Sequence, residues 1–224
     1  MILLLLCIAF GESEVPYFDE GRLEFDYFSD QLLEFRKTSQ IDFLWVKPGF
    51  DLSTASLKYE AWPTATFIGE DADGRDEDDQ NLAITIGTLT PQTLRSELLH
   101  RIKFSPERDV VVRGRVCDAS TGSEGGKYFV GFGVGQGSVA VDLKFCDAQT
   151  GELLVAIHHR IVSGSNFSTS SSKYNGWLKK MVKSVASKGF DALYSAGTKP
   201  KQDKRPKDSE AEHVDRQKED EDTF

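Results

Sequence analysis

The sequence of 224 residues has few of the features that identify large classes of protein. It contains three cysteines and no Cys-x-x-Cys pair, which disfavours zinc and thiol redox motifs. No apolar run approaches the roughly 20 residues that a membrane-spanning helix needs. Hydrophobic residues make up 39% and charged residues 28%. That balance excludes a polytopic membrane protein, a collagen-like chain and a wholly disordered chain.

Catalytic signatures are also missing. The chain has no Gly-x-Ser-x-Gly, no His-Glu-x-x-His and no legible Ser/His/Asp arrangement. His158 and His159 are adjacent in a predicted strand, so their side chains point to opposite faces and cannot bind one metal together. The sequence therefore nominates no catalytic residue and no cofactor, and we expect a protein that is not an enzyme.

The chain has fewer basic than acidic residues: 27 Lys and Arg and 36 Asp and Glu give a net charge of −9. The charge is distributed unevenly along the chain: residues 81–197 have 14 basic and 9 acidic side chains, whereas residues 70–79 have seven acids and one arginine. A uniformly acidic protein is a poor ligand for nucleic acid, because phosphate contacts need a cationic stripe. We expect no nucleic-acid partner.

The acidic run 70–79 is the one candidate for a metal. Its carboxylate density suggests calcium, with Asp71, Asp73 and Asp78 as weak ligand candidates. The spacing is not that of an EF-hand, so we favour a solvated loop over residues 69–81. The alternative function that this run would support is a small-ligand or calcium-dependent hydrolytic enzyme.

Residues 1–11 are apolar and match a signal peptide in length. Ala9 and Gly11 are small and two apart, as a signal peptidase requires before its cleavage site. Cys7 invites a lipoprotein interpretation, but Leu6 before it is not small, which leaves membrane association open. We expect export to the periplasm or cell envelope. The alternative is a cytoplasmic protein whose N-terminus is a buried strand.

The rest of the chain predicts one α+β domain, an α/β sandwich, over residues 41–196. We expect a mostly antiparallel sheet of about five strands with two helices packed on one face. Alternation and turn residues predict strands at 43–46, 56–62, 110–116, 128–146 and 153–162, with 82–86 as a short extended segment. The last two long strands form a hairpin around the turn 147–151.

Helices and flanks complete the predicted architecture. Thr90 and Pro91 are the cap and first residue of one helix, and an apolar stripe from Trp177 to Leu193 marks the other. Residues 12–40 form an acidic arm that packs its aromatic side chains on the core, with a short helix near Asp30–Arg36. Residues 197–224 are a charged tail without core residues, which we expect to be disordered.

Two surfaces could bind a partner. Four glycines at period two fall on one face of a strand, where another backbone or a helix can approach closely: Gly131, Gly133, Gly135 and Gly137. They do not match the dinucleotide fingerprint, which needs a third glycine at i+5. Three lysines form the exposed side of the second helix: Lys179, Lys180 and Lys183.

Cys117 and Cys146 each end a strand-like run. In an exported chain they could form a disulfide, provided that their strands are neighbours. Two free, half-buried thiols are the alternative.

Residues 129–154 resemble a family of bacterial envelope proteins, domain of unknown function 4410. The resemblance is carried by the Gly-Phe-Gly-Val-Gly strand at 131–135 and the Asp-Ala-Gln-Thr-Gly turn at 147–151. Residues 43–53, with Trp-Val-Lys-Pro-Gly-Phe-Asp-Leu-Ser, look like the opening of the related family 3313. Together the similarities span roughly residues 40–195. The resemblance implies an exported or lipid-anchored α/β sandwich and supplies no catalytic residues.

These observations favour an exported envelope domain that binds a protein partner, or serves as an accessory to a transport or assembly complex.

Overall fold

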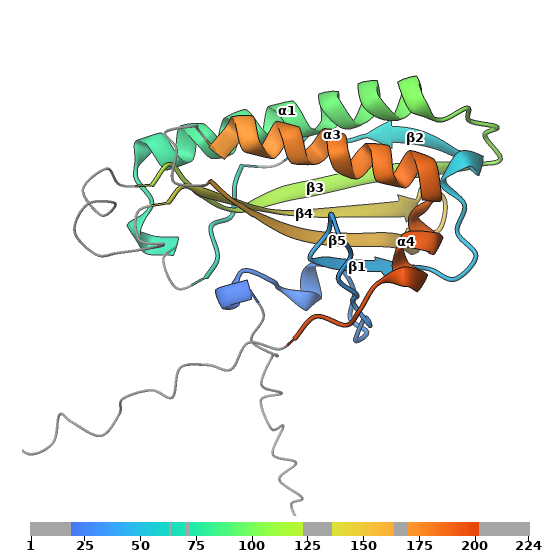
Figure 1. Ribbon diagram of the computed structural model, residues 1–224, viewed down its shortest axis with the longest axis horizontal. Helices are drawn as coiled ribbons and strands as arrows, with labels where there is room; N and C mark the ends of the chain where they lie inside the picture. The colour runs from blue at the N-terminus through green and yellow to red at the C-terminus, as the bar shows by residue number, and fades with distance from the viewer. Residues whose placement is uncertain (1–18, 63, 70–71, 123–135, 164–169, 202–224) are drawn as a thin grey trace, which may run out of the picture.

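The computed structural model describes residues 19–62, 64–69, 72–122, 136–163 and 170–201 (Figure 1). Residues 1–11, the proposed signal peptide, lie outside this range, as do residues 128–135 of the predicted fourth strand. The elements are β1 (Phe43–Val46), β2 (Ala55–Tyr59), α1 (Glu77–Arg101), β3 (Arg108–Ser120), β4 (Ser138–Asp147), β5 (Leu153–Val162), α3 (Ser170–Lys188) and α4 (Phe190–Ala196). Short 3₁₀ turns lie at Asp19–Gly21, Phe25–Tyr27, Leu52–Thr54 and Ala72–Gly74.

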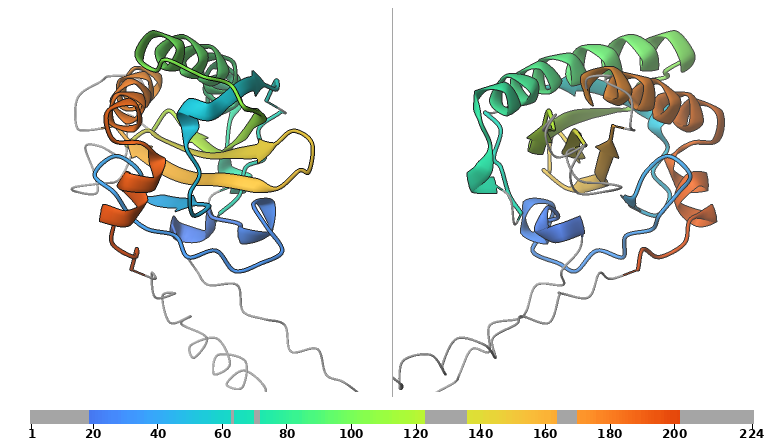
Figure 2. Two further views of the ribbon diagram at one scale, coloured as in Figure 1. Left: turned by 90° about the vertical axis from the view of Figure 1, so that its right-hand side faces the viewer. Right: turned by 60° about the vertical axis from the view of Figure 1, so that its left-hand side comes forward.

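The five strands form one sheet in the order β1-β5-β4-β3-β2. Only β2 and β3 run parallel, while every other neighbouring pair is antiparallel. Helices α1 and α3 cover one face of the sheet, and the N-terminal arm crosses the other (Figures 1 and 2). The predicted α+β class, with its mostly antiparallel sheet and helices on one face, is confirmed.

The main core lies between the sheet and the helices. Inward residues of β4 such as Val141, Leu143 and Phe145 alternate with outward ones, as the sequence pattern predicts. The hairpin of β4 and β5 is confirmed, and Asp147 stabilises its turn by accepting hydrogen bonds from the backbone N–H groups of Gln149 and Thr150.

The predicted start of α1 is wrong. Residues that the sequence pattern assigned to a loop, an extended segment and a helix cap form one helix of 25 residues. Asp76 caps it by accepting a hydrogen bond from the N–H of Asp79, and acids in the first turn favour the positive end of the helix dipole. Thr90 is not a cap: it is buried inside the helix, where its hydroxyl contacts the Ile86 carbonyl and the Tyr174 hydroxyl, both at 2.7 Å.

Two other predicted helices differ from the structure. Gly189, with φ of 77°, breaks the last apolar stripe into α3 and α4. Residues 30–36 are not helical, and Arg36 instead pairs with Leu44 on the outer side of β1. Beyond α4, Thr198 exchanges backbone hydrogen bonds with Lys37. Residues 202–224 of the predicted tail lie outside the described range.

Among the described residues, no helix has both the length and the apolar character that crossing a bilayer demands.

Candidate functional site

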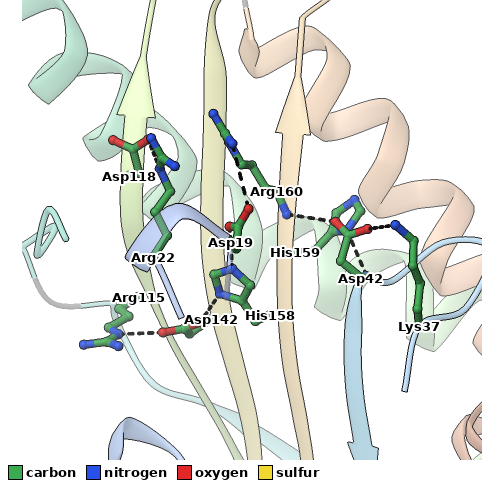
Figure 3. A network of polar contacts seen from close by, with 10 residues as sticks. All are labelled: Asp19, Arg22, Lys37, Asp42, Arg115, Asp118, Asp142, His158, His159 and Arg160. Carbon is green, nitrogen blue, oxygen red and sulfur yellow. Dashed lines mark hydrogen bonds and ion pairs between the residues drawn. The ribbon is translucent and has the colours of Figure 1, made fainter. Parts of the chain in front are cut away.

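The sheet face opposite the helices carries a row of polar side chains. The strand register aligns Arg115 with Asp142 and Asp142 with His158, so one side chain from each of β3, β4 and β5 stands side by side (Figure 3). Their neighbours in sequence point to the main core because side chains alternate along a strand. A row of charged groups is therefore built into the centre of the sheet.

His158 lies between two carboxylates. Its Nδ1 is 2.7 Å from Asp142 Oδ1, and its Nε2 is 2.8 Å from Oδ2 of Asp19 in the arm (Figure 3). Burial by itself would lower the pKa of His158, but the hydrogen bonds and charges of Asp142 and Asp19 outweigh it and raise the pKa to about 9. The fully buried ring is thus an imidazolium that joins the arm to the sheet.

Arg115 completes the row on its other side. Its Nε donates to Asp142 Oδ2 at 2.8 Å, its Nη1 pairs with Glu24 of the arm at 3.0 Å, and its guanidinium lies 3.9 Å from the centre of the Tyr27 ring. Lys144 donates to the Tyr27 backbone carbonyl at 2.8 Å. Arm side chains therefore cover the row with both charge and aromatic surface.

A second buried acid ties further segments to this face. Asp118 is fully buried and accepts hydrogen bonds from Arg22 of the arm at 2.8 Å and from Arg75, just before α1, at 2.7 Å. An aromatic cluster on the same face packs Leu23, Phe28 and Phe35 against Phe43. The aromatic residues of the arm that the structure describes pack on this face of the sheet, while Tyr17 and Phe18 lie outside the described residues.

His159 points to the helix side, where its ring stacks on Trp177 of α3 with centroids 4.3 Å apart. Its Nδ1 pairs with Asp42 at 2.7 Å, and Asp42 also contacts Lys37 (Figure 3). The two adjacent histidines thus serve opposite faces, as their spacing predicts.

Cys117 lies against the row. Its Sγ, a carboxylate oxygen of Asp142 and a ring nitrogen of His158 all lie within 4.8 Å of one another. Burial, followed by the charge of Asp142, holds the pKa of the Cys117 thiol well above its ordinary value. A buried, protonated thiol is not an activated nucleophile, so this grouping does not work as a Cys–His pair in the conformation described.

The predicted alternative of a Cys117–Cys146 disulfide is excluded by the register. Both thiols are free and buried. Their strands are neighbours, but Cys146 lies opposite Val111, six residues along β3 from Cys117. At about 3.3 Å per residue that separation is about 20 Å, far beyond the reach of a disulfide.

The other predicted site residues do not join the row. Lys179, Lys180 and Lys183 are exposed on α3. Gly131, Gly133 and Gly135 lie outside the described residues, as does Asp71. Gly137 is closely packed, since a Cβ there would lie 2.8 Å from the Ser120 carbonyl oxygen and against Ser170 Oγ.

The acidic run does not form a convergent set of ligands among its described residues. Asp73 is exposed in a 3₁₀ turn, and Asp78 is exposed in the first turn of α1. Asp79 turns inward and accepts hydrogen bonds from the N–H and hydroxyl of Thr121. These acids begin and anchor a helix, which is the structural role that the loop interpretation missed.

Sequence reasoning also missed the row itself. The available signal was the pair Arg115 and Asp142, which lie on the strand faces that end in Cys117 and Cys146. Their meeting with His158 and Asp19 depends on strand register and on the path of the arm, which no local spacing encodes.

A shallow apolar groove lies at the edge of the sheet that β2 forms. It has a volume of about 230 Å³ and is lined by Ala55, Ser56, Leu57, Tyr59, Arg95, Leu99, Phe104 and Pro106. Strand β2 forms one wall and the end of α1 the other. Leu99, in the wall formed by α1, is 62% exposed.

No curated protein matches the chain. The PelC dodecamer from Paraburkholderia phytofirmans is 15% identical, with a TM-score of 0.40, covering 67% of this chain and 94% of that one. A "putative lipoprotein" from Caulobacter crescentus CB15 is 14% identical, with a TM-score of 0.31, covering 64% and 90%. Likeness this loose carries nothing about function to this chain.

The sequence comparison is firmer. The model of the family described as "Domain of unknown function (DUF4410)" matches residues 50–162, just over half of the chain. This range contains β2 to β5, α1 and the turn at 147–151 that carried the resemblance. The chain belongs to the DUF4410 family.

Proposed function

We propose that the protein is an exported cell-envelope domain that is not an enzyme and that binds a protein partner through the open edge of its sheet. Export is supported by the apolar N-terminus with Ala9 and Gly11 at signal-peptidase spacing. A non-enzymatic role is supported by the polar row, whose charges are paired and covered by the arm.

The observation that carries the partner site is the groove beside β2. Strand β2 ends the sheet, so among the described residues no strand pairs with its outer side. The other edge differs, because Arg36 pairs there with Leu44 of β1. An open edge next to an apolar groove is the arrangement that accepts an added strand: backbone hydrogen bonds give affinity, and the groove selects side chains.

The occupant that fits is an extended, apolar segment of another envelope protein. The lining is largely aliphatic and aromatic, with Leu99, Phe104 and Leu57 as its apolar wall. Arg95 in the groove favours an acidic residue at one end of that segment. Among the described residues, Arg95 makes no salt bridge that would compete with such a contact.

The test places a photo-crosslinking amino acid at Ser56, in the groove, and compares two variants of the full chain in cells. Leu99→Glu should reduce the crosslink to an envelope protein by about tenfold, the equivalent of about 1.4 kcal/mol. Ile84→Glu is the matched control, because Ile84 is also on α1 and also 62% exposed but does not line the groove. Equal crosslinking in both variants, or no discrete crosslinked species in the parent, overturns the proposed site.

Localisation is tested separately, by measuring the intact mass of the native protein in cell fractions. A mass beginning at Glu12, found in the envelope fraction, supports export. A full-length chain in the cytoplasmic fraction contradicts it.

A further inference from the structure

Three buried donor side chains converge beneath the arm, and nothing in the proposed partner site uses them. Cys117, Asp142 and His158 come from the adjacent strands β3, β4 and β5 and are all 0% exposed. Their donor atoms lie within 4.8 Å of one another. A thiol, a carboxylate and an imidazole are the donors that bind Zn²⁺ in proteins.

The surroundings resemble the outer shell of a metal site. A metal-binding histidine normally donates its second ring N–H to a carboxylate, which fixes the ring orientation. Here Asp19 Oδ2 holds His158 Nε2 at 2.8 Å and leaves Nδ1 facing the cluster. Arg115 holds Asp142 through Oδ2 at 2.8 Å and leaves Oδ1 facing the cluster. Both orienting contacts therefore spare the atoms that would bind the ion.

We propose that Cys117 Sγ, Asp142 Oδ1 and His158 Nδ1 form a binding site for Zn²⁺ under the N-terminal arm. In the metal-free protein, protons occupy this space: the Nδ1–H of His158 points to Asp142, and the Cys117 thiol is within hydrogen-bonding reach of the same carboxylate. The ion replaces both protons, which leave to solvent. Two positive charges enter and two depart, so the buried cluster keeps its net charge.

The exchange needs only small movements. Donor atoms around a tetrahedral zinc ion stand about 3.3–3.8 Å apart. His158 Nδ1 and Asp142 Oδ1 must part from 2.7 Å, and the widest pair must close from at most 4.8 Å. Nearby cations already have carboxylate partners: Glu24 and Asp142 for Arg115, and Asp118 for Arg22. A water completes the fourth position of the proposed site.

The test uses Co²⁺ as a spectroscopic substitute for Zn²⁺ on the reduced, metal-stripped full chain. Thiolate ligation to Co²⁺ produces a near-ultraviolet charge-transfer band, which a site without cysteine cannot produce. We expect one equivalent of Co²⁺ to generate this band and Zn²⁺ to abolish it by displacement. If the wild-type protein shows no such band at saturating Co²⁺, the proposal is overturned without recourse to any variant.

Variants then assign the band. Cys7→Ser and Cys146→Ser should both retain it, and they are matched controls because they remove the other two thiols of the chain. Cys117→Ser should lose it. Asp19→Asn should keep the band but bind Co²⁺ 10- to 100-fold more weakly, the range typical of an outer-shell partner. A band that survives in Cys117→Ser, or one that disappears in Cys146→Ser, contradicts the assignment.

Discussion

The charged state of His158 predicts an unusual dependence of stability on pH in the metal-free protein. The histidine faces Asp142 from β4, Asp19 from the arm and Cys117 from β3, with Arg115 and Arg160 behind the two carboxylates. Its pKa rises from the ordinary 6.5 to about 9 in the folded protein. The folded chain therefore holds this proton more tightly than the unfolded chain.

The direction and size of this pH dependence follow from the coupling between proton binding at His158 and folding. Because the folded pKa is raised, the stabilisation is fully present below about pH 6.5 and is lost as the pH rises through about 9. A pKa unit is worth about 1.36 kcal/mol, so the shift corresponds to roughly 3 kcal/mol for this fully buried ring.

The assay is urea unfolding with a chelator present, at intervals from about pH 6 to about pH 9.5, with tryptophan fluorescence as the signal. Wild type should lose roughly 3 kcal/mol more than His158→Gln over this interval, since glutamine removes the titrating group. His100→Gln, at an exposed position near the end of α1, should follow wild type. If wild type and His158→Gln lose stability in parallel, the imidazolium interpretation is refuted.

Three further substitutions test the structure by urea unfolding. Asp142→Asn should cost about 3–5 kcal/mol, because it removes the buried carboxylate that Arg115 and His158 share; a loss below about 1 kcal/mol would contradict a charged network. Gly114→Ala should cost about 1–3 kcal/mol or more, since its Cβ would overlap the Trp62 ring and lie 2.7 Å from the Asp142 backbone oxygen. The control is Gly87→Ala in α1, where the new Cβ would lie 3.8 Å from its nearest neighbour. There the higher helix propensity of alanine should stabilise the protein by about 0.5–1 kcal/mol. If the two substitutions changed the free energy of unfolding alike, Trp62 would not pack closely on Gly114. Asp76→Ala should cost about 1 kcal/mol, because it removes the N-cap of α1. An unchanged midpoint of urea unfolding would mean that the helix begins at another residue.

The arm gives the molecule its second layer and explains why the polar row is stable. Buried charges are costly unless they are paired, and each arm contact supplies a partner to a strand residue: Asp19 to His158, Glu24 to Arg115 and Arg22 to Asp118. Displacing the arm would expose these charges to water and open the Cys117 cluster at the same time. The metal site and the pH dependence therefore report on the same segment.

Local pattern was sufficient for much of the fold. Alternating apolar residues placed β1, the β4–β5 hairpin and the core face of β3, because side-chain alternation is a property of each strand alone. The glycine-rich sequence at 131–135 and the turn at 147–151 led to the family. The lysines of α3 were correctly assigned to its exposed side.

The helix α1 shows where local pattern misled. Seven acids in ten residues suggested a loop, yet acids at the start of a helix are stabilised by capping and by the dipole. Pro91 suggested a first helical residue, yet it lies inside the helix, where buried Leu94 and Ile86 on either side anchor the chain against the core.

By itself, the sequence determined the strand and hairpin pattern, the family and the exposed face of α3, because each depends on residues close together in the chain. Only the tertiary structure decided which charges meet: Asp19, Cys117, Asp142 and His158 come from the arm and three strands, and their contact depends on register and on the path of the arm. The same register separated Cys117 from Cys146. A shift of one residue along any strand would move each of these side chains to the other face, and that constraint is set by the packing of the whole sheet.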